Sequence, residues 1–404
     1  MEWKEVNIAN APKVRLTELL DFIVDNRGKT VPTSASGTPL IATNCIKNEL
    51  LYPAFEKVRY VSEDIYKTWF RSHPIPGDII FVNKGTPGKT ALVPDPVNFC
   101  FAQDMMAFRV NSHLVYNKYL LAVLRSRFVQ QFIMNSQVGT IIPHFKKEQL
   151  KSILIPLPTM EIQRKIGDFY FSLSEKCEVN RKINENLEQQ AQALFKSWFV
   201  DFEPFQNGEF EDSELGRIPK GWKVSVLSEI ANITMGQSPS GSSYNEEHKG
   251  TEFYQGSADF GWRFPKERVY TTEPLRFAKS NSVLMSVRAP VGTMNISLNN
   301  CCIGRGLASI HSKNQADSYV IYLMKSLKAL LNSFNGDGTV FGSINKKALE
   351  GLGIIVPPKN IIDSFEKIVS PIDKLIRNYF LENTRLSHLR DTLLPKLMSG
   401  EIEV

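Results

Sequence analysis

Short apolar runs bounded by Gly, Pro or Asn alternate with longer amphipathic stretches along this chain. The short runs are typical of strands, whereas the longer stretches place apolar residues three and four positions apart, as a helix does. The strand-like runs are residues 38–46, 77–85, 99–110, 281–289 and 307–311. The helix-like stretches are residues 116–134 and 317–334. The pattern predicts mixed α/β domains, α+β in class.

Two still longer stretches carry the hydrophobic spacing of a coiled coil. In the second, nine positions alternate steps of three and four residues, and eight of them are apolar or aromatic. These positions are Phe365, Ile368, Ile372, Leu375, Tyr379, Glu382, Leu386, Leu389 and Leu393. In the first, the spacing is carried by Ile166, Phe169, Leu173, Ile183, Leu187 and Leu194, with Lys176, Asn180 and Gln190 interrupting it.

Each of these stretches is long enough for a helical rod of roughly 50 Å. Each follows a strand-like run that ends in prolines, "IPLP" at 155–158 and "VPPK" at 356–359. Proline cannot continue a central strand, and its fixed φ suits the entry to a helix. We expect the two helices to pair antiparallel with each other; the alternative is two ordinary amphipathic helices on separate cores.

The chain repeats itself at an offset of about two hundred residues. The clearest pair is "VGTIIPHFKKEQL" at 138–150 and "DGTVFGSINKKAL" at 337–349. Four further pairs follow the same order. They are 16–32 with 227–239, 77–93 with 281–297, 101–108 with 303–310, and 153–166 with 352–368. Five pairs in one order predict a duplicated unit.

The repeat and the two long helices predict five segments. They are a first domain at 1–158, a first long helix at 159–202, an acidic, turn-rich linker at 203–215, a second domain at 216–358, and a second long helix with a C-terminal tail at 359–404.

Charge follows this division. Residues 1–158 hold 19 basic and 13 acidic side chains, and residues 216–358 hold 16 and 10. The segment 159–215 holds 6 basic and 12 acidic side chains, and 359–404 is balanced. Basic domains can collect a phosphate backbone, whereas acidic or neutral helices are poor at it. The alternative is a mildly basic protein with scattered charge.

Several function classes find no support in the sequence. No apolar run approaches the ~20 residues of a membrane span, and the N-terminal residues lack the pattern of a secretory signal. The five scattered cysteines form no CxxC pair, which favours a reducing, cytoplasmic setting, and the six histidines show no metal-ligand spacing. The stretch "NKGTPGKT" has Asn83 where a phosphate-binding loop needs Gly. The prediction is a non-catalytic protein with no cofactor and no metal.

Several stretches resemble the specificity subunit of type I restriction-modification systems, and the resemblance covers essentially the whole chain. It is carried by "AQALFKSWFVDFEPF", "IPKGWKVSVLSEIANITMGQSPSG", "VRAPVGTMNIS", "CCIGRGLASI" and "LRDTLLPKLMSGEI".

The resemblance implies two target-recognition domains separated by two helices that form an antiparallel coiled coil. It implies that each domain reads one half of a bipartite, asymmetric double-stranded DNA target. It also implies two methyltransferase (modification) subunits as partners, two restriction subunits in the full complex, and no membrane. The alternative is a non-enzymatic coiled-coil scaffold with two similar binding domains.

Candidate DNA-binding residues are polar or basic side chains on loops, because such groups reach phosphates and base edges, and the basic residues next to glycines that recur in both units are the best supported. In the first domain they are Arg27, Lys29, Thr30, Asn44, Lys84, Lys89, Thr140, His144, Lys146 and Lys147. In the second they are Gln237, Ser238, Arg263, Arg288, Arg305, Thr339, Ser343, Asn345, Lys346 and Lys347. The alternative for each is a solvated surface group.

Candidate partner-binding residues lie at the ends of the two long helices, where large apolar side chains follow the coiled-coil spacing. They are Trp198, Phe199, Phe202, Leu394 and Leu397. Part of this set is also suited to capping the coiled coil.

Overall fold

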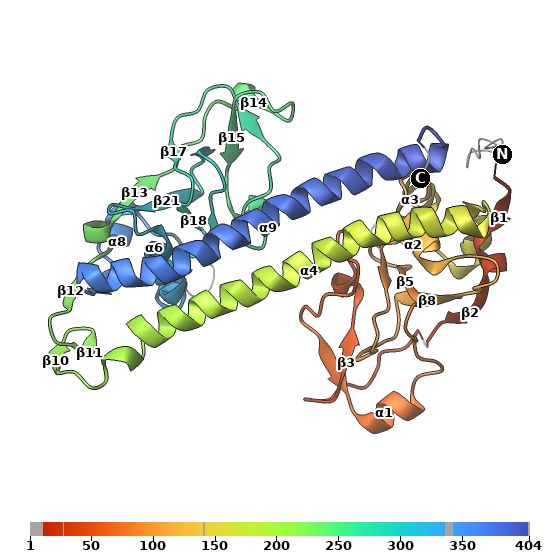
Figure 1. The fold of residues 1–404 in the computed structure, drawn as a ribbon, viewed down its shortest axis with the longest axis horizontal. Coiled ribbons are helices and arrows are strands. Elements are labelled where there is room, and N and C mark those ends of the chain that lie inside the picture. Colours follow the sequence, from red (N-terminus) through yellow and green to blue (C-terminus); the bar gives the residue numbers. More distant parts are fainter. Residues whose placement is uncertain (1–10, 27, 140–141, 336–341, 403–404) are drawn as a thin grey trace. The chain divides into compact units, whose positions relative to one another are not determined.

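The computed structural model describes residues 11–26, 28–139, 142–335 and 342–402 (Figure 1). The chain forms two compact units. The first contains the described residues up to Lys182 together with those from Phe380 onward, and the second runs from Ile183 to Tyr379. Each unit therefore holds one globular domain and part of both long helices.

The first domain is built on an antiparallel sheet of four strands in the order β2-β8-β5-β6. These strands are β2 (Leu20–Val24), β5 (Ile79–Val82), β6 (Thr90–Leu92) and β8 (Met105–Val110). All four residues of β5 are buried because alternate side chains enter different cores. Ile79 and Phe81 pack with helix α2, whereas Ile80 and Val82 pack with the second sheet.

That second sheet has the order β4-β3-β7, with β3 parallel to β7. Its strands are β3 (Thr38–Ile41), β4 (Arg59–Val61) and β7 (Cys100–Phe101). A further pair joins β1 (Lys13–Arg15) to β9 (Leu154–Pro156). The helices of the domain are α1 (Glu63–Thr68), α2 (Asn117–Arg125) and α3 (Arg127–Ser136), with 3-10 turns η2 (Leu16–Leu19), η3 (Thr43–Cys45) and η4 (Lys147–Ser152).

The second domain repeats this plan. Its main sheet has the order β13-β21-β18-β19, formed by β13 (Ala231–Met235), β18 (Val283–Ser286), β19 (Met294–Ile296) and β21 (Leu307–Ser312). Its other sheet has the order β14-β16-β15-β20-β17 and again contains one parallel pair, β15 with β20. The strands are β14 (Tyr244–Asn245), β15 (Thr251–Tyr254), β16 (Tyr270–Thr271), β17 (Phe277–Ala278) and β20 (Cys301–Ile303).

The remaining elements of this unit complete the correspondence. Strand β12 (Lys223–Val226) pairs with β22 (Gly353–Val356), as β1 pairs with β9. The helices are α5 (Leu227–Ile230), α6 (Asp317–Ser326), α7 (Lys328–Asn332) and α8 (Lys346–Glu350), with 3-10 turns η5 (Glu203–Phe205), η6 (Gly241–Ser243), η7 (Ser257–Asp259) and η8 (Ser333–Asn335). The segment predicted as a linker, 203–215, contains η5 and strand β10 (Phe210–Ser213), which pairs with β11 (Gly216–Pro219). The predicted fold class, with two similar mixed domains and two long helices, is confirmed.

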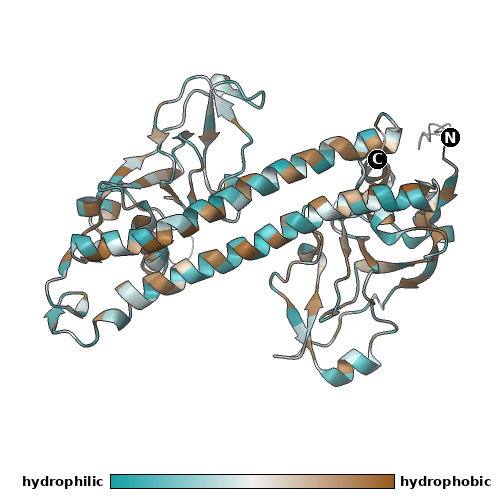
Figure 2. Cartoon of the chain, in the orientation of Figure 1, coloured by the Kyte–Doolittle hydropathy of each residue, from teal (hydrophilic) through white to brown (hydrophobic). Residues whose placement is uncertain are grey.

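The long helices are α4 (Met160–Phe199) and α9 (Lys359–Ser399). Apolar and polar residues alternate around both (Figure 2). In the first unit, Asn180 Nδ2 donates to Glu382 Oε2 over 2.8 Å and to Asn383 Oδ1 over 2.9 Å. In the second unit, Asn184 Nδ2 donates to the Ile376 carbonyl over 3.2 Å. Residues later in α4 contact residues earlier in α9, so the helices are antiparallel within each unit.

The predicted seam of α9 is wrong at three of its nine positions. Phe365 is buried as expected, but Ile368, Leu375 and Leu389 are exposed. The next residue along the chain is buried instead in each case, namely Val369, Ile376 and Arg390. The predicted heptad period is correct. The buried positions are shifted by one residue, which corresponds to a rotation of the helix about its axis, and sequence spacing alone does not set that rotation.

The seam of α4 is more polar than predicted. Ile166 is buried as expected, whereas the predicted Phe169, Leu173, Ile183, Leu187 and Leu194 are half-buried. The buried positions in the middle of the helix are Ser174, Glu178, Asn180, Asn184 and Glu188. Buried asparagines in a helix pair fix its register, because every other register leaves their amides unpaired.

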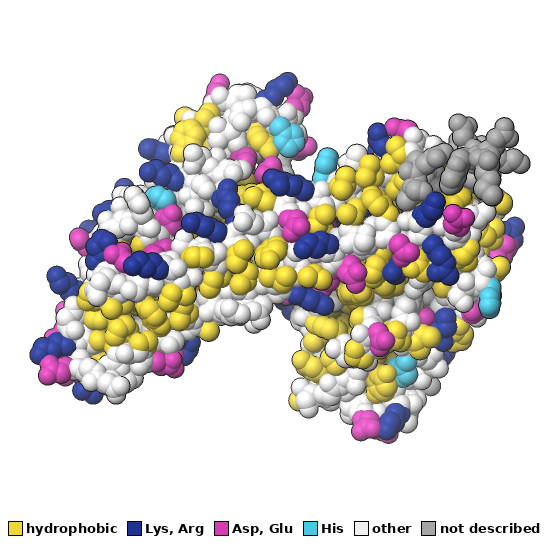
Figure 3. All heavy atoms as spheres, in the orientation of Figure 1, with side chains coloured by type: hydrophobic (Ala, Val, Ile, Leu, Met, Phe, Trp, Pro, Cys, Tyr) yellow, Lys and Arg dark blue, Asp and Glu magenta, His cyan; other side chains and the backbone are white. Residues whose placement is uncertain are grey.

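Basic and acidic side chains are interspersed over the face of the molecule seen in Figure 3. Helix α4 itself carries 6 basic and 6 acidic residues. Such a surface has no continuous region of one sign for a phosphate backbone. Among the described helices, none is both long enough and apolar enough to cross a membrane.

Candidate nucleic-acid interface

In the first domain, the Gly-Thr stretch lies against the turn that joins β5 to β6, residues 83–89. Gly85 N donates to the Pro143 carbonyl over 2.9 Å, and Phe145 N donates to the Asn83 carbonyl over 2.7 Å. The repeated loop and the Gly/Pro turn therefore form one surface feature, which we call the double turn.

The second domain builds the same double turn from residues 287–293 and 342–347. Ala289 N donates to the Gly342 carbonyl over 3.1 Å, and Ile344 N donates to the Val287 carbonyl over 3.0 Å. The hydrogen-bonding positions match those of the first domain one for one. The sequence repeat therefore encodes a conserved contact between two loops.

The double turns bring candidate DNA-binding residues together in pairs. Lys84 and His144 form an antiparallel bridge in the first domain, and Arg288 and Ser343 form the equivalent bridge in the second. Lys84 and His144 are half-exposed, whereas Arg288 and Ser343 are exposed. In each domain a basic side chain thus lies beside a polar one at the same corner of the main sheet.

The two corners differ in their ion pairs. In the first domain, Lys84 Nζ lies 3.6 Å from Asp104 Oδ1, and Lys147 Nζ lies 2.8 Å from Asp25 Oδ2. Neither aspartate was predicted as a site residue, because a lone acidic residue in a loop carries no recognisable pattern. In the second domain, Lys346 pairs with Glu350 of its own helix over 3.4 Å.

Three further candidates gather beside the second double turn. The Arg305 backbone N–H donates to Ser238 Oγ over 3.2 Å, and Gln237 N donates to the Ile303 carbonyl over 2.9 Å. The side chains of Arg305 and Gln237 are exposed. Val287 N donates to the carbonyl of Gly306, the residue after Arg305, over 3.0 Å. This hydrogen bond joins the segment that carries Arg305 to the double turn.

Other candidates lie on the surface without such a cluster. Lys29, Thr30, Lys146 and Lys347 are exposed, and Lys89 is half-buried. Asn44 is exposed and donates from Nδ2 to the Glu56 carbonyl over 2.6 Å, while Asn345 Oδ1 caps α8 by accepting from Ala348 N over 2.9 Å. Arg27, Thr140 and Thr339 lie outside the described residues.

Asn26 organises the loop after β2 and was not predicted. Its buried side chain donates to the Phe101 carbonyl over 3.0 Å and to the Ser72 carbonyl over 3.1 Å. Its Oδ1 accepts from Arg71 N over 2.9 Å. Buried amides that join segments far apart in sequence give no local signal, so only the fold identifies this residue.

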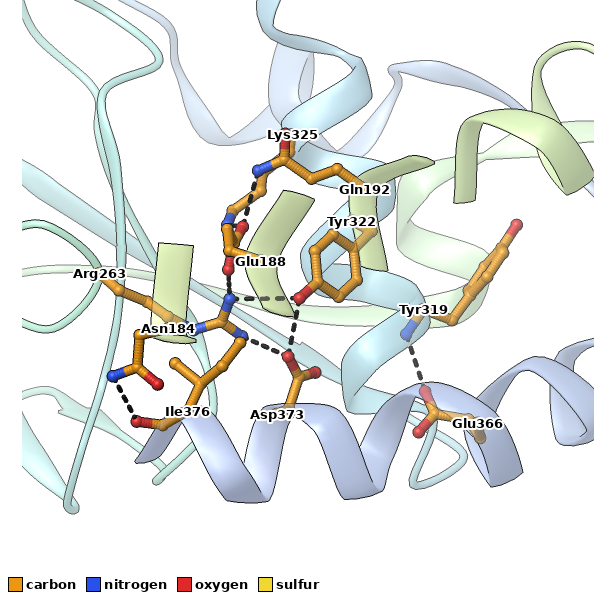
Figure 4. A network of polar contacts seen from close by, with 10 residues as sticks. All are labelled: Asn184, Glu188, Gln192, Arg263, Tyr319, Tyr322, Lys325, Glu366, Asp373 and Ile376. Carbon is orange, nitrogen blue, oxygen red and sulfur yellow. Dashed lines mark hydrogen bonds and ion pairs between the residues drawn. The ribbon is translucent and has the colours of Figure 1, made fainter. Parts of the chain in front are cut away.

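The structure corrects the prediction for Arg263, which is buried rather than available to DNA. Its guanidinium contacts Glu188 of α4, donates to Asp373 of α9 over 2.6 Å, and donates to the Tyr322 hydroxyl over 3.2 Å (Figure 4). Lys325 also contacts Glu188. A guanidinium buried against two carboxylates is not accessible to a base or a phosphate.

A carboxylate of α9, that of Glu366, lies about two helical turns before Asp373. Tyr319 N donates to Glu366 Oε1 over 2.7 Å (Figure 4). Burial raises the pKa of Glu366 to about 7, and the neighbouring Asp317 and Asp373 add to the shift. In the first unit, Tyr116 N, just before α2, donates to Gln163 Oε1 of α4 over 2.9 Å.

The predicted partner-binding residues also require correction. Phe199, Phe202, Leu394 and Leu397 are buried within their own units. Phe199 packs against Tyr319 and Phe365, Phe202 packs against Trp222, and Leu394 belongs to the core of the first domain. Trp198 is half-buried and contacts Phe205 and Phe365 edge-on. These side chains close the cores where each long helix ends.

Apolar side chains remain exposed elsewhere on the long helices. In the second unit, Ile368 and Leu375 lie two turns apart on α9, with 47% and 44% of their surface exposed. In the first unit, Leu389 of α9 and Val179 of α4 are each 44% exposed. Large apolar groups exposed in this way on a helix are typical of contacts with another protein.

Among the described residues, no group of three or more His, Cys, Asp or Glu is arranged to hold a metal ion. All five cysteines are free thiols. The groups that the double turns present to a ligand are hydrogen-bond donors and positively charged side chains.

Comparison with known proteins agrees with this geometry. A protein of Methanocaldococcus jannaschii named for the specificity subunit of the type I restriction enzyme MjaX is 32% identical over 86% of this chain and 84% of its own. The specificity subunit of the type I restriction enzyme MjaIX from the same organism is 27% identical over 100% of this chain and 97% of its own.

Among solved structures, the S subunit of a type I restriction-modification system from M. genitalium matches with a TM-score of 0.56. It is 18% identical and covers 98% of both chains, which supports the fold. The family model described as the type I restriction modification DNA specificity domain matches residues 11–189 and again 219–390. The chain belongs to the type I restriction-modification DNA specificity family, whose two domains recognise DNA sequence.

Proposed function

We propose that this chain is the DNA-recognition subunit of a type I restriction-modification complex and that each domain presents its double turn to one half of a bipartite target. The observation that carries this is the pair of matching loop contacts, each with a basic side chain beside a polar one. Because the side chains at equivalent positions differ, the two half-sites have different sequences.

The residues at the double turns divide by the chemistry they offer. Arg288 and Arg305 carry planar guanidinium groups that can make two parallel hydrogen bonds to a guanine edge or to a phosphate. Lys84, Lys147 and Lys346 are better suited to phosphates, which position the protein without reading sequence. Ser343 and His144 occupy one equivalent position in the two domains, so they are candidates to distinguish the half-sites.

We further propose that the long helices hold the domains at a spacing set by the DNA helical repeat and dock two methyltransferase subunits. Each unit exposes its own apolar side chains on these helices, Ile368 and Leu375 in the second and Leu389 in the first. Two such patches suit two copies of one partner. Methyl transfer and cleavage belong to the modification and restriction subunits, two of each, and the specificity subunit contributes no catalytic group. We also infer a cytoplasmic setting, because the target is DNA and the cysteines are free.

The test is selection from a pool of random double-stranded DNA by the chain in complex with its methyltransferase subunits. The expected result is enrichment of one motif with two specified halves and an unspecified gap. Replacing the first domain with that of a homologue should change one half only. Absence of any enriched motif, or a change in both halves after the exchange, would contradict the proposal.

A further inference from the structure

The two double turns have different charge balances although their backbones match. In the first domain, carboxylates lie beside both lysines, with Asp104 at Lys84 and Asp25 at Lys147. All four side chains are partly exposed. The positive charge of this corner is therefore largely neutralised at the surface.

In the second domain the corresponding positions carry no charge. Gly306 is the equivalent of Asp104. Gly306 directly precedes β21, which pairs with β18, and Asp104 directly precedes β8, which pairs with β5 in the same way. The same pairing places Met235 where the first domain has Asp25. Among the described residues, no carboxylate lies within ion-pair distance of Arg288 or Arg305.

The backbone at Asp104 argues that its carboxylate has a role of its own. Asp104 has a φ of +71°, in the left-handed region that costs a residue with a side chain about 1 kcal/mol or more. Its carbonyl accepts from Asn83 N over 3.0 Å, so the conformation is held by the turn that carries Lys84. Gly306, at the equivalent position, does not have a positive φ, and a Cβ added there would lie only 2.5 Å from the Gln255 carbonyl oxygen.

Stability does not explain the ion pair. A partly exposed pair at 3.6 Å contributes about 0–1 kcal/mol, which is no more than the backbone cost. A carboxylate at this distance instead competes with phosphate for Lys84 and repels a DNA backbone that approaches the corner. That competition acts on every DNA sequence, whereas hydrogen bonds to the correct bases act on the target alone.

We propose that Asp104 and Asp25 are specificity-determining residues that weaken the grip of the first domain on non-target DNA, while Arg288 and Arg305 of the second domain supply most of the sequence-independent grip. The inference rests on the proposed function, because it assumes that the double turns face DNA. On the correct half-site, base contacts make it favourable for Lys84 and Lys147 to break their ion pairs with Asp104 and Asp25 and to pair with phosphates instead.

The experiment measures binding of the full chain, in complex with its methyltransferase subunits, to poly(dI-dC) as a function of salt. Asp104→Asn keeps the shape of the side chain, and asparagine tolerates the left-handed conformation. The variant should bind poly(dI-dC) more tightly. The slope of log affinity against log salt should steepen by about 0.9, the contribution of one phosphate contact. Asp64→Asn removes an exposed carboxylate from α1 of the same domain and should leave the slope unchanged.

A double-mutant cycle identifies the mechanism. The steeper slope of Asp104→Asn should disappear when Lys84→Ala is also present, because the released lysine makes the new contact. An equal gain with and without Lys84 would overturn the proposal, since it would show general repulsion alone. No gain from Asp104→Asn would overturn it as well.

Arg288→Ala separates this inference from the proposed function. It should make the poly(dI-dC) slope shallower by about 0.9. If Arg288→Ala has this effect and Asp104→Asn has none, the double turns bind DNA and only the role of the aspartates is refuted. If neither variant changes the slope, both the inference and the assignment of the double turns to DNA are refuted.

Discussion

The Arg263 guanidinium donates to Asp373 Oδ1 over 2.6 Å, which links a loop of the second domain to helix α9. Arg263→Met should destabilise the second unit by about 3–5 kcal/mol, because it leaves Asp373 without a cation and Glu188 with Lys325 alone. Denaturant unfolding followed by circular dichroism measures the loss. Arg276→Met, at an exposed position of the same domain, is the matched control and should change stability by less than about 0.5 kcal/mol. Equal losses of stability in the two variants would show that the buried cluster contributes no more than an exposed arginine does.

Glu366 should make the stability of the protein depend on pH. Its pKa is raised from 4.5 to about 7, so between these values the folded state binds more protons than the unfolded state. The free energy of unfolding should therefore fall as the pH rises from 4.5 to about 7. Glu366→Gln, which keeps the acceptor for Tyr319 N, should flatten this part of the profile. A profile unchanged by the substitution would assign the dependence to other groups.

Asn180 should contribute to the stability of the helix pair through its hydrogen bonds to Glu382 and Asn383. Asn180→Ala should cost about 1 kcal/mol, because the half-buried Glu382 and Asn383 of α9 lose a hydrogen-bond partner. Asn186→Ala, at an exposed position of the same helix, should cost only a few tenths of a kcal/mol at the level of a surface substitution. Chemical denaturation of both variants compares the two sites directly.

The exposed apolar residues of the long helices should be needed for assembly. Ile368→Glu and Leu389→Glu should each reduce the amount of methyltransferase subunit that co-purifies, and the double variant should reduce it further. Leu275→Glu places the same charge on an exposed apolar position away from these helices and should not affect assembly. Full assembly of the double variant would place the docking surface elsewhere.

Much of the fold followed from local patterns. The alternation of apolar runs predicted both mixed domains, and five ordered repeats predicted their similarity. The prediction failed where rotation or burial decides the outcome. The heptad spacing of α9 was right, yet Leu375 is exposed and Ile376 is buried, because a rotation of one residue about the axis preserves the period.

The candidate site shows the same limit. Lys84 and His144 were both selected as repeated polar positions, and the structure brings them together. Arg263, predicted as a basic residue beside Trp262 outside the repeats, is buried, because its partners Glu188 and Asp373 lie 75 and 110 residues away and only the fold assembles them. Asp104 was missed because its importance depends on a backbone angle and on a lysine from another loop.

The division of the chain has a consequence for its synthesis. The second unit is one uninterrupted segment, Ile183–Tyr379, whereas the first also needs the segment from Phe380 onward, whose Leu394 enters its core. On the ribosome the second unit can close before the first is complete, although the first domain is translated earlier. The first domain must therefore wait with part of its apolar core uncovered, and its yield in the cell will depend on how well it is protected during that interval.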